Sequence, residues 1–330
     1  MLVTLAASAP AGPLATMALS SAPSDVDGGL DLAARIGALK PAPGRGSTRD
    51  LWEALATIAA VDLGAVRAVE PHLDAVAILV QAGVPVPPGP AGVFAAEGGE
   101  PLAAAETAEG WMLDGTKPWC SLADRLDWAL ITATLDGGQR QLFLVDLHHP
   151  GVVVEPGRWV ARGLTEVPSG PVQFTAVPAE PIGAPGWYLE RPGFAWGGIG
   201  VAACWYGGAV GIGRTIHDAA RTKPNPYLLM HLGAIDELLQ SSRRALAEAA
   251  TRIDAGDSDP LLVKRVRATV ARACEEIIDR AGHALGPAPL ALDAAHAKRV
   301  ADLALYVRQH HAERDQASLG TAVASGPLPW

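Results

Sequence analysis

One segment of the chain, residues 110–121, combines an aromatic side chain and a hydroxyl at a spacing that suits a planar ligand. It reads GWMLDGTKPWCS, and its Asp114-Gly115 pair is typical of a tight hairpin turn. Because side chains alternate between the two faces of a strand, Trp119 and Ser121 should share one face of the outgoing arm. Pro118 places that arm at a sheet edge. The alternative is an ordinary hairpin with a core tryptophan and a solvated serine.

The pattern of this segment resembles the flavin-contacting strand of the acyl-CoA dehydrogenase family. The matching residues are Gly110, Trp111, Gly115, Lys117, Trp119, Cys120 and Ser121. The resemblance implies a bound FAD whose isoalloxazine ring packs against Trp119, with the Ser121 hydroxyl near the N5/O4 edge of that ring. It also implies an oxidoreductase that acts on CH–CH groups of an acyl thioester and assembles as a homodimer or homotetramer.

The carboxylate base that this resemblance implies is missing from both of its usual positions. In an α,β-dehydrogenation, hydride leaves Cβ while a base removes the proton from Cα. Counted from Arg299 and Asp302, one family position falls on His310, and the other falls within 201–203. The helical spacing from Leu303 predicts that His310 points inward, and an imidazole with a pKa of about 6.5 can act as a base. The alternative is a histidine that only packs.

Two further positions correspond to cofactor contacts of the family. Arg221, near the end of an expected helix, corresponds to an arginine that meets the flavin pyrophosphate of a neighbouring subunit, but it could equally stabilise the helix C-terminus. Gly282 and Gly286 correspond to a glycine-rich turn that, in the family, approaches the adenine dinucleotide between its last two helices. A helix C-cap would also explain both glycines. The family's Thr-Glu-Pro segment corresponds to residues 95–99, where the threonine is missing.

Two other motifs are better explained by packing or solvation. Residues 198–203 match a GxGxxA dinucleotide fingerprint, but no apolar strand precedes them, and the small residues continue to Gly213. This pattern predicts a closely packed helix face. The pairs His310 with Glu313 and His311 with Asp315 have helical spacing, but the facing Glu-x-x-His motifs of a metal-binding bundle are missing. We therefore predict no metal site.

The elements that must position these residues fall into three expected domains. Residues 1–90 form a shortened N-terminal helical domain that starts with a loose arm, residues 91–188 a β-domain, and residues 189–330 a helical bundle. Helical apolar spacing runs from about residue 31 to 82, with N-cap candidates at Ser47, Thr48 and Asp50, and a proline-rich break follows at 84–92.

The β-domain and the bundle follow from the change in apolar spacing after this break. Short β-like runs at 128–134, 141–147, 152–154 and 172–176, with a hairpin signal at 136–138, favour an antiparallel barrel or sandwich. About four long amphipathic helices follow Gly193, one of them capped by Ser258-Asp259-Pro260. The predicted fold class is therefore α+β, of the acyl-CoA dehydrogenase type.

Composition excludes several classes of protein. The 330 residues are 49 % hydrophobic, and no apolar run reaches the roughly 20 residues that a membrane helix needs. A net charge of −9 without a Lys/Arg cluster disfavours nucleic acid. Three widely spaced cysteines indicate neither a disulfide framework nor a zinc site, which suits a reducing cytoplasm. We expect a small-molecule substrate.

Three functional hypotheses follow. The first is an FAD-dependent acyl thioester dehydrogenase that uses His310 as its base. The second is a flavin-dependent monooxygenase of the same fold, a group that often carries histidine where the dehydrogenases carry glutamate. The third is a non-catalytic subunit that completes the site of a partner.

Overall fold

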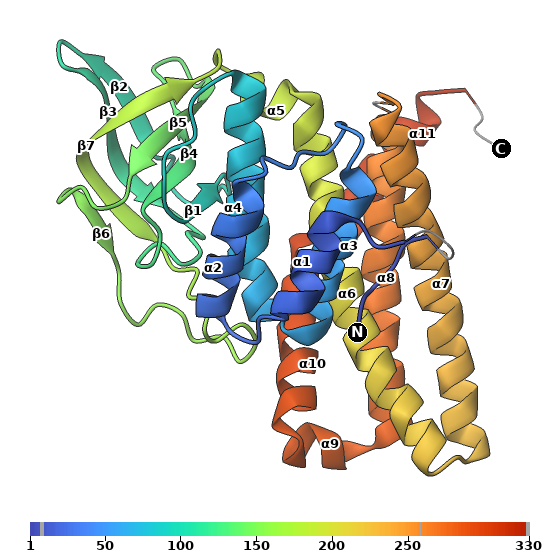
Figure 1. The fold of residues 1–330 in the computed structure, drawn as a ribbon. Helices are drawn as coiled ribbons and strands as arrows, with labels where there is room; N and C mark the ends of the chain where they lie inside the picture. The colour runs from blue at the N-terminus through green and yellow to red at the C-terminus, as the bar shows by residue number, and fades with distance from the viewer. Residues whose placement is uncertain (7–9, 258, 328–330) are drawn as a thin grey trace.

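The computed structural model describes residues 1–6, 10–257 and 259–327. A β-barrel lies beside a group of long helices, with helix α4 between the two (Figure 1). The N-terminal helices are α1 (Pro13–Ser21), α2 (Val26–Gly37), α3 (Thr48–Val61) and α4 (Leu63–Ala82). Helices α3 and α4 are buried over most of their length, and most of their buried residues are apolar.

The N-terminal segment packs against this helical layer, so the prediction of a loose arm is wrong for its described residues. Val3 and Leu5 are buried, and their backbone N–H groups donate to Thr57 Oγ1 at 3.0 Å and to Glu53 Oε1 at 2.8 Å. Pro13 starts α1 instead of interrupting it. The buried polar side chains of α3 therefore fix the start of the chain. Residues 7–9 lie outside the described residues.

Asp50, one of the residues expected to cap the helix that begins near residue 48, instead caps α1. Ser47 is the N-cap residue of α3 but makes no capping side-chain bond. The Asp50 carboxylate instead accepts from the backbone N–H groups of Leu14 and Ala15, each at 3.0 Å, at the start of α1. Asp50 therefore stabilises α1 across a tertiary contact, as a carboxylate does at a helix N-terminus.

Seven strands form the barrel. They are β1 (Ala91–Phe94), β2 (Ala103–Thr107), β3 (Gly110–Lys117), β4 (Trp128–Thr134), β5 (Arg140–Asp146), β6 (Val152–Val154) and β7 (Val172–Ile182). The order is β1-β4-β2-β3-β7-β5, and β5 also pairs with β4, which closes the sheet, while β6 pairs with β7. Most pairs are antiparallel, as predicted, but β1 and β2 pair with β4 in parallel. The predicted hairpin turn at 136–138 joins β4 and β5.

The predicted hairpin turn at Asp114-Gly115 is wrong. Strand β3 continues through both residues and pairs with β2 on one side and with β7 on the other. The register with β7 shifts between Leu113 and Gly115, where Gly115 has a φ of 118°. A glycine with positive φ serves a bulge as well as a turn. The actual turn is at residues 108–109, between β2 and β3.

The C-terminal helices are α5 (Trp187–Glu190), α6 (Pro192–Thr222), α7 (Pro226–Asp254), α8 (Pro260–Leu285), α9 (Pro287–Leu292), α10 (Ala294–Tyr306) and α11 (Ala312–Ala324), with a 3₁₀ turn η1 (Val307–Gln309) before α11. Helices α7, α8 and α10 of this region pack against α6, and α11 packs against α8. The Asp259 side chain accepts from Leu261 N–H at 2.8 Å, so this half of the expected cap is confirmed. Ser258 lies outside the described residues.

The small residues of α6 serve helix packing, as predicted. Residues 198–203 lie inside α6, with no strand before them. A Cβ on Gly207 would collide with the Ala56 backbone of α3, and one on Gly208 would crowd Leu63 at 3.0 Å. Helix α6 is long and apolar enough to cross a bilayer, but 67 % of its most apolar window is buried within the protein. Its composition is therefore that of a core helix.

Candidate functional site

The segment after β3 is a loop with two strained residues. Trp119 has a φ of 61° and Leu122 a φ of 58°, in the left-handed region that non-glycine residues rarely adopt. The backbone N–H groups of Cys120 and Leu122 donate to the carbonyls of Gly170 and Pro168 at 3.0 and 2.8 Å, which holds this conformation. The prediction of an outgoing strand that aligns Trp119 and Ser121 is therefore wrong, because its alternation ends at Lys117.

Trp119 and Ser121 lie in different surroundings within this loop. The Trp119 side chain is 59 % exposed and meets the Trp159 ring edge-on at 6.4 Å. Ser121 is partly buried and turned toward α4. An exposed indole held at a strained backbone position offers a flat surface, and such strain is a reason to suspect function.

Ser121 belongs to an ordered chain of hydrogen bonds. Arg67 Nη2 donates to Ser121 Oγ at 3.0 Å, and Ser121 Oγ lies 2.7 Å from Ser169 Oγ. Ser169 Oγ donates to the Val167 carbonyl at 3.1 Å. Because a guanidinium only donates and Ser169 uses its proton on the carbonyl, the Ser121 hydroxyl donates to Ser169. Rotating this hydroxyl would offer its proton to a ligand.

Arg67 is part of a charged face on α4 that the sequence analysis missed. Arg67, Glu70 and Asp74 follow one another at helical spacing, and Arg67 Nη1 lies 3.2 Å from Glu70 Oε2. Burial raises the pKa of Glu70 to about 7, against the opposing effect of Arg67. The signal that could have found this face was three charged residues at i, i+3 and i+7 in an otherwise apolar helix.

An aromatic cluster lies behind Arg67. The Arg67 guanidinium lies 5.1 Å from the centre of the Tyr306 ring, and the Tyr306 and Trp205 rings meet edge-on at 6.3 Å. Arg267 covers the Trp205 ring at 4.9 Å. Tyr306 Oη and Trp205 Nε1 are buried without a hydrogen-bond partner among the described residues. Buried polar atoms of this kind normally form hydrogen bonds with a ligand or a water molecule.

His310 lies at the far side of this cluster. It is buried, with 9 % exposure, and its ring meets Trp205 edge-on at 6.5 Å. It follows the end of η1 in an extended conformation, so the predicted continuous helix through His310 is wrong although the side chain is buried. Burial lowers the His310 pKa, and Asp315 opposes this effect. Trp205, Tyr306 and Arg67 link His310 to Ser121, and no direct hydrogen bond joins the two in the described residues.

The other predicted cofactor residues lie elsewhere. Arg221 is exposed near the end of α6, and Gly282 lies inside α8. Of the two glycines, Gly286 is the C-cap of α8, with a φ of 66° and its N–H donating to the Gly282 carbonyl at 3.0 Å, so the C-cap explanation of Gly282 is wrong. These helix ends lie near α9, away from the barrel (Figure 1). Within one chain, Arg221 and Gly282 are not brought to Ser121.

The segment at 95–99 supports the end of β3. The Lys117 ammonium is buried and donates to the carbonyl and the hydroxyl of Thr132 at 2.7 and 2.8 Å. Glu97 Oε1 lies 3.5 Å from Lys117 Nζ. These contacts fix the point at which the chain leaves the sheet toward Trp119. Over the ranges that the structure describes, three or more His, Cys, Asp or Glu side chains nowhere form a group suited to a metal ion.

Comparisons with known proteins show the fold of the chain. No family model and no curated protein matches the sequence. FMN-bound TdsC, a dibenzothiophene monooxygenase from Paenibacillus sp. A11-2, matches 93 % of this chain and 94 % of its own, with a TM-score of 0.75 and 17 % identity. Butyryl-CoA dehydrogenase from Megasphaera elsdenii matches 94 % and 96 %, with a TM-score of 0.77 and 13 % identity.

A third structure matches nearly the whole length of this chain. Nitrososynthase from Micromonospora carbonacea var. africana matches 99 % of this chain and 100 % of its own, with a TM-score of 0.73 and 18 % identity. Identities this low show a shared fold and nothing finer. The predicted fold class is thus confirmed: the chain has the acyl-CoA dehydrogenase fold.

Proposed function

We propose that the protein is a flavin-dependent oxidoreductase whose flavin ring lies against Trp119, with its polar edge at the Ser121 hydroxyl. The observation that carries this proposal is the Ser121 hydrogen-bond chain, in which Arg67 orients a hydroxyl that lies two residues along the chain from the exposed Trp119 indole. The residues fit the group, because a planar aromatic ligand needs a flat apolar surface and a positioned donor. A bound flavin would supply hydride acceptance or, when reduced, reaction with oxygen.

The residues of this chain have separable roles in the proposal. Arg67 donates to Ser121 Oγ, so a ligand acceptor can take the serine proton in place of Ser169. Glu70, with a pKa of about 7, can hold or release a proton at its carboxyl oxygens near neutral pH. His310 remains the proposed base of a dehydrogenase, acting on a substrate that displaces part of the aromatic cluster.

One observation favours oxygen chemistry over acyl thioester dehydrogenation. The first side chains behind Ser121 are the ion-paired Arg67 and Glu70, each about one-tenth exposed. An acyl chain needs apolar walls, and burying a charged pair against it is costly. We therefore place a monooxygenase ahead of an acyl thioester dehydrogenase.

The flavin is proposed to be FAD, with FMN as the alternative. Arg221 is exposed, so it is accessible to the flavin pyrophosphate of a neighbouring subunit. TdsC binds FMN, which lacks the adenosine half. Titrating the protein with each flavin and following flavin fluorescence separates the two, since contacts from Arg221 and Gly282 would favour FAD alone.

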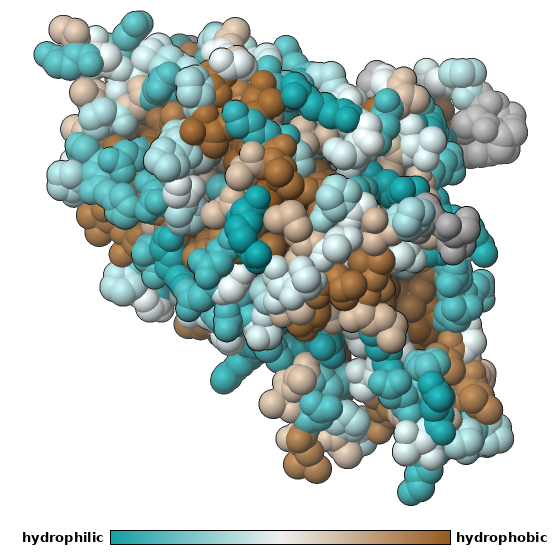
Figure 2. All heavy atoms as spheres, viewed as in Figure 1, coloured by the Kyte–Doolittle hydropathy of each residue, from teal (hydrophilic) through white to brown (hydrophobic). Residues whose placement is uncertain are grey.

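We further propose that the protein self-associates in the cytoplasm through one end of the bundle. Large apolar side chains are exposed at the start of α7 and in α9, namely Tyr227, Leu229, Met230, Leu290 and Leu292. Figure 2 shows hydrophobic residues on the surface at this lower end, with hydrophilic residues between them. Exposed patches of this kind mark interaction sites. Sedimentation of the protein and of Leu292→Asp would test this, since a dimer should dissociate in the variant.

The central experiment measures flavin binding. The purified protein should be yellow or take up added flavin, and Trp119→Ala and Ser121→Ala should each weaken binding by about tenfold, the effect of one charge-assisted hydrogen bond or ring contact. Leu19→Ala, which removes an exposed apolar side chain on α1, away from the loop and from the proposed self-association patch, is the control. Anaerobic bleaching by acyl-CoA would favour the dehydrogenase, and oxygenated product after chemical reduction would favour the monooxygenase. A protein that takes up neither flavin is not an oxidoreductase of this kind.

A further inference from the structure

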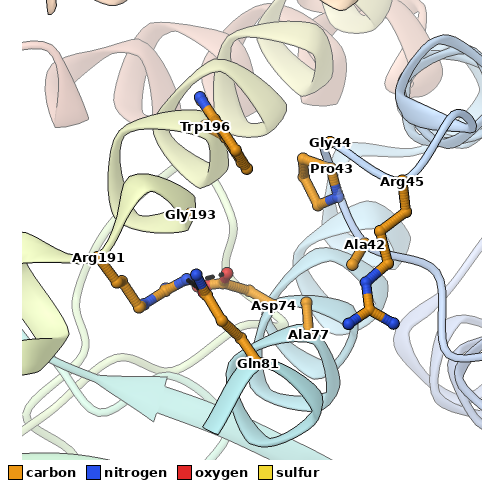
Figure 3. A pocket seen from close by; sticks show the side chains of 10 residues that line it. All are labelled: Ala42, Pro43, Gly44, Arg45, Asp74, Ala77, Gln81, Arg191, Gly193 and Trp196. Carbon is orange, nitrogen blue, oxygen red and sulfur yellow. Dashed lines mark hydrogen bonds and ion pairs between the residues drawn. The ribbon is translucent and has the colours of Figure 1, made fainter. Parts of the chain in front are cut away.

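A cavity of about 170 Å³ lies at the other end of the charged face of α4. Its walls come from the loop between α2 and α3, from the C-terminal half of α4 and from the start of α6 (Figure 3). The polar lining residues are Arg45, Asp74, Gln81 and Arg191, and the Trp196 ring forms an apolar wall. Ser121 is not among its lining residues, so the cavity is a separate place in the fold.

Arg191 contributes a guanidinium that is buried and incompletely paired. Its side chain is 3 % exposed, and Nη1 donates to Gln81 Oε1 at 3.0 Å. Nε is buried without a hydrogen-bond partner among the described residues. The guanidinium also stacks on Tyr188 at 5.2 Å, which fixes its plane. A buried guanidinium with unused donors is suited to a carboxylate ligand.

Asp74 contributes a carboxylate that faces the same cavity. Its nearest cation is Arg191 Nη2, and the 3.8 Å between them is longer than a hydrogen bond. Its side chain is 24 % exposed, and burial raises its pKa against the effect of Arg191. Figure 3 shows Asp74 and Arg191 turned toward each other at the edge of the cavity. The carboxylate therefore has room to accept a hydrogen bond from a ligand.

The opposite wall holds an exposed cation on a tightly seated loop. Gly44 has a φ of 79°, and a Cβ there would lie 2.6 Å from the Trp196 ring. This close approach holds residues 42–45 against α6, while Arg45 itself is exposed at the rim. Two arginines and one aspartate give the lining a net charge of +1 when all are ionised. A lining with one excess positive charge suits a ligand that carries one negative charge.

We propose that this cavity binds a small 2-hydroxycarboxylate. The carboxylate would pair with Arg191 and Arg45, and the hydroxyl would donate to Asp74. A zwitterionic amino acid carries no net charge and would leave the positive excess of the lining unbalanced, so it fits less well. The site does not depend on the proposed flavin chemistry.

Three matched probes test this proposal on the purified full-length protein: lactate, propionate, which lacks the hydroxyl, and propane-1,2-diol, which lacks the carboxylate. Binding is followed by calorimetry and by ligand-observed NMR. Lactate should bind with a Kd of about 1 mM, as expected of so small a ligand, and about tenfold more tightly than propionate. The diol should show no saturable binding.

Variants connect binding to the cavity. Arg45→Ala, at an exposed position, should weaken lactate binding about tenfold while thermal unfolding is unchanged. Asp74→Ala should make lactate and propionate bind alike. Arg162→Ala removes an exposed arginine outside the cavity and should change neither affinity.

Glycine binding as tightly as lactate would reassign the site to amino acids and overturn the proposal. Equal affinities for lactate and propionate in the unaltered protein, no effect of Arg45→Ala, or no saturable binding of lactate would overturn it as well.

Discussion

Each end of the charged face of α4 places a carboxylate near an arginine guanidinium, but the two pairs differ in how closely they are held. At one end Arg67 and Glu70 are 3.2 Å apart and closed in by Ser121 and Tyr306, whereas at the other Asp74 and Arg191 are 3.8 Å apart and border a cavity. A tightly paired buried ion pair fixes its neighbours in one geometry, while a loosely paired one keeps donors and acceptors for a ligand. The difference assigns positioning to the first pair and binding to the second.

Breaking the tight pair should have the largest effect. In Arg67→Met, Glu70 stays buried without its cation, and Ser121 loses its donor. Because the Glu70 pKa is about 7, the effect is measured at about pH 9, where Glu70 is ionised, and there we expect the free energy of unfolding in urea to fall by about 3–5 kcal/mol. The double variant Arg67→Met with Glu70→Leu should recover most of this loss. A loss below about 1 kcal/mol in the single variant would show that the pair is not tightly coupled to the fold.

The pH dependence of stability should report Glu70. Its folded pKa of about 7 lies above the ordinary value of 4.5, so the folded state binds the proton more tightly, and stability falls as pH rises from about 4.5 to 7. The loss is at most about 3.4 kcal/mol, at 1.36 kcal/mol for each of the roughly 2.5 units between 4.5 and 7. His72, whose pKa burial lowers to about 4, acts in the opposite direction over part of this range. Comparison with Glu70→Gln, which keeps His72, isolates the Glu70 contribution, and identical pH profiles would contradict it.

Ser169→Ala should sharpen the role of the Ser121 hydroxyl. The Ser121 proton is donated to Ser169, and removing that acceptor leaves it for a bound flavin. We expect flavin affinity to rise several-fold, on the scale of about 1 kcal/mol for one hydrogen bond. Flavin titration measures the change, and Ser318→Ala, outside the loop, is the control. Weaker flavin binding in Ser169→Ala would mean that Ser169 itself binds the ligand.

The sequence predicted more of the fold than of the site, and the reason is physical. Strands β4 and β6 and the packed face of α6 follow from apolar spacing, which acts over neighbouring residues. The Ser121 loop departs from its expected strand because contacts with residues 168–170, far along the chain, hold Trp119 at a positive φ. Asp50 likewise caps a helix 35 residues away. Such tertiary hydrogen bonds leave no local pattern.

The charged face of α4 is a different case, because its signal was present in the sequence. Arg67, Glu70 and Asp74 share one helix face, but their pairing could not be read from spacing. Arg191, the partner of Asp74, lies more than 100 residues away, across the whole barrel domain. Only the fold brings this buried guanidinium to α4. Local spacing could therefore have indicated a charged face, which the sequence analysis missed, but not its division into a closed end and an open end.

Replacing Asp74 at the open end of the charged face should change the free energy of unfolding least. Asp74→Asn removes one charge of a pair whose nearest atoms are 3.8 Å apart, beyond hydrogen-bond distance, and keeps an oxygen acceptor in its place, so stability should change by about 1 kcal/mol or less. The charge of Asp74 also helps to raise the pKa of Glu70, so the variant should shift the pH profile of stability toward lower pH. Urea denaturation across this pH range measures both effects. If Asp74→Asn lowered the free energy of unfolding as much as Arg67→Met, the two ends would be equivalent. If the pH profile of stability did not move, the charge of Asp74 would not affect the pKa of Glu70.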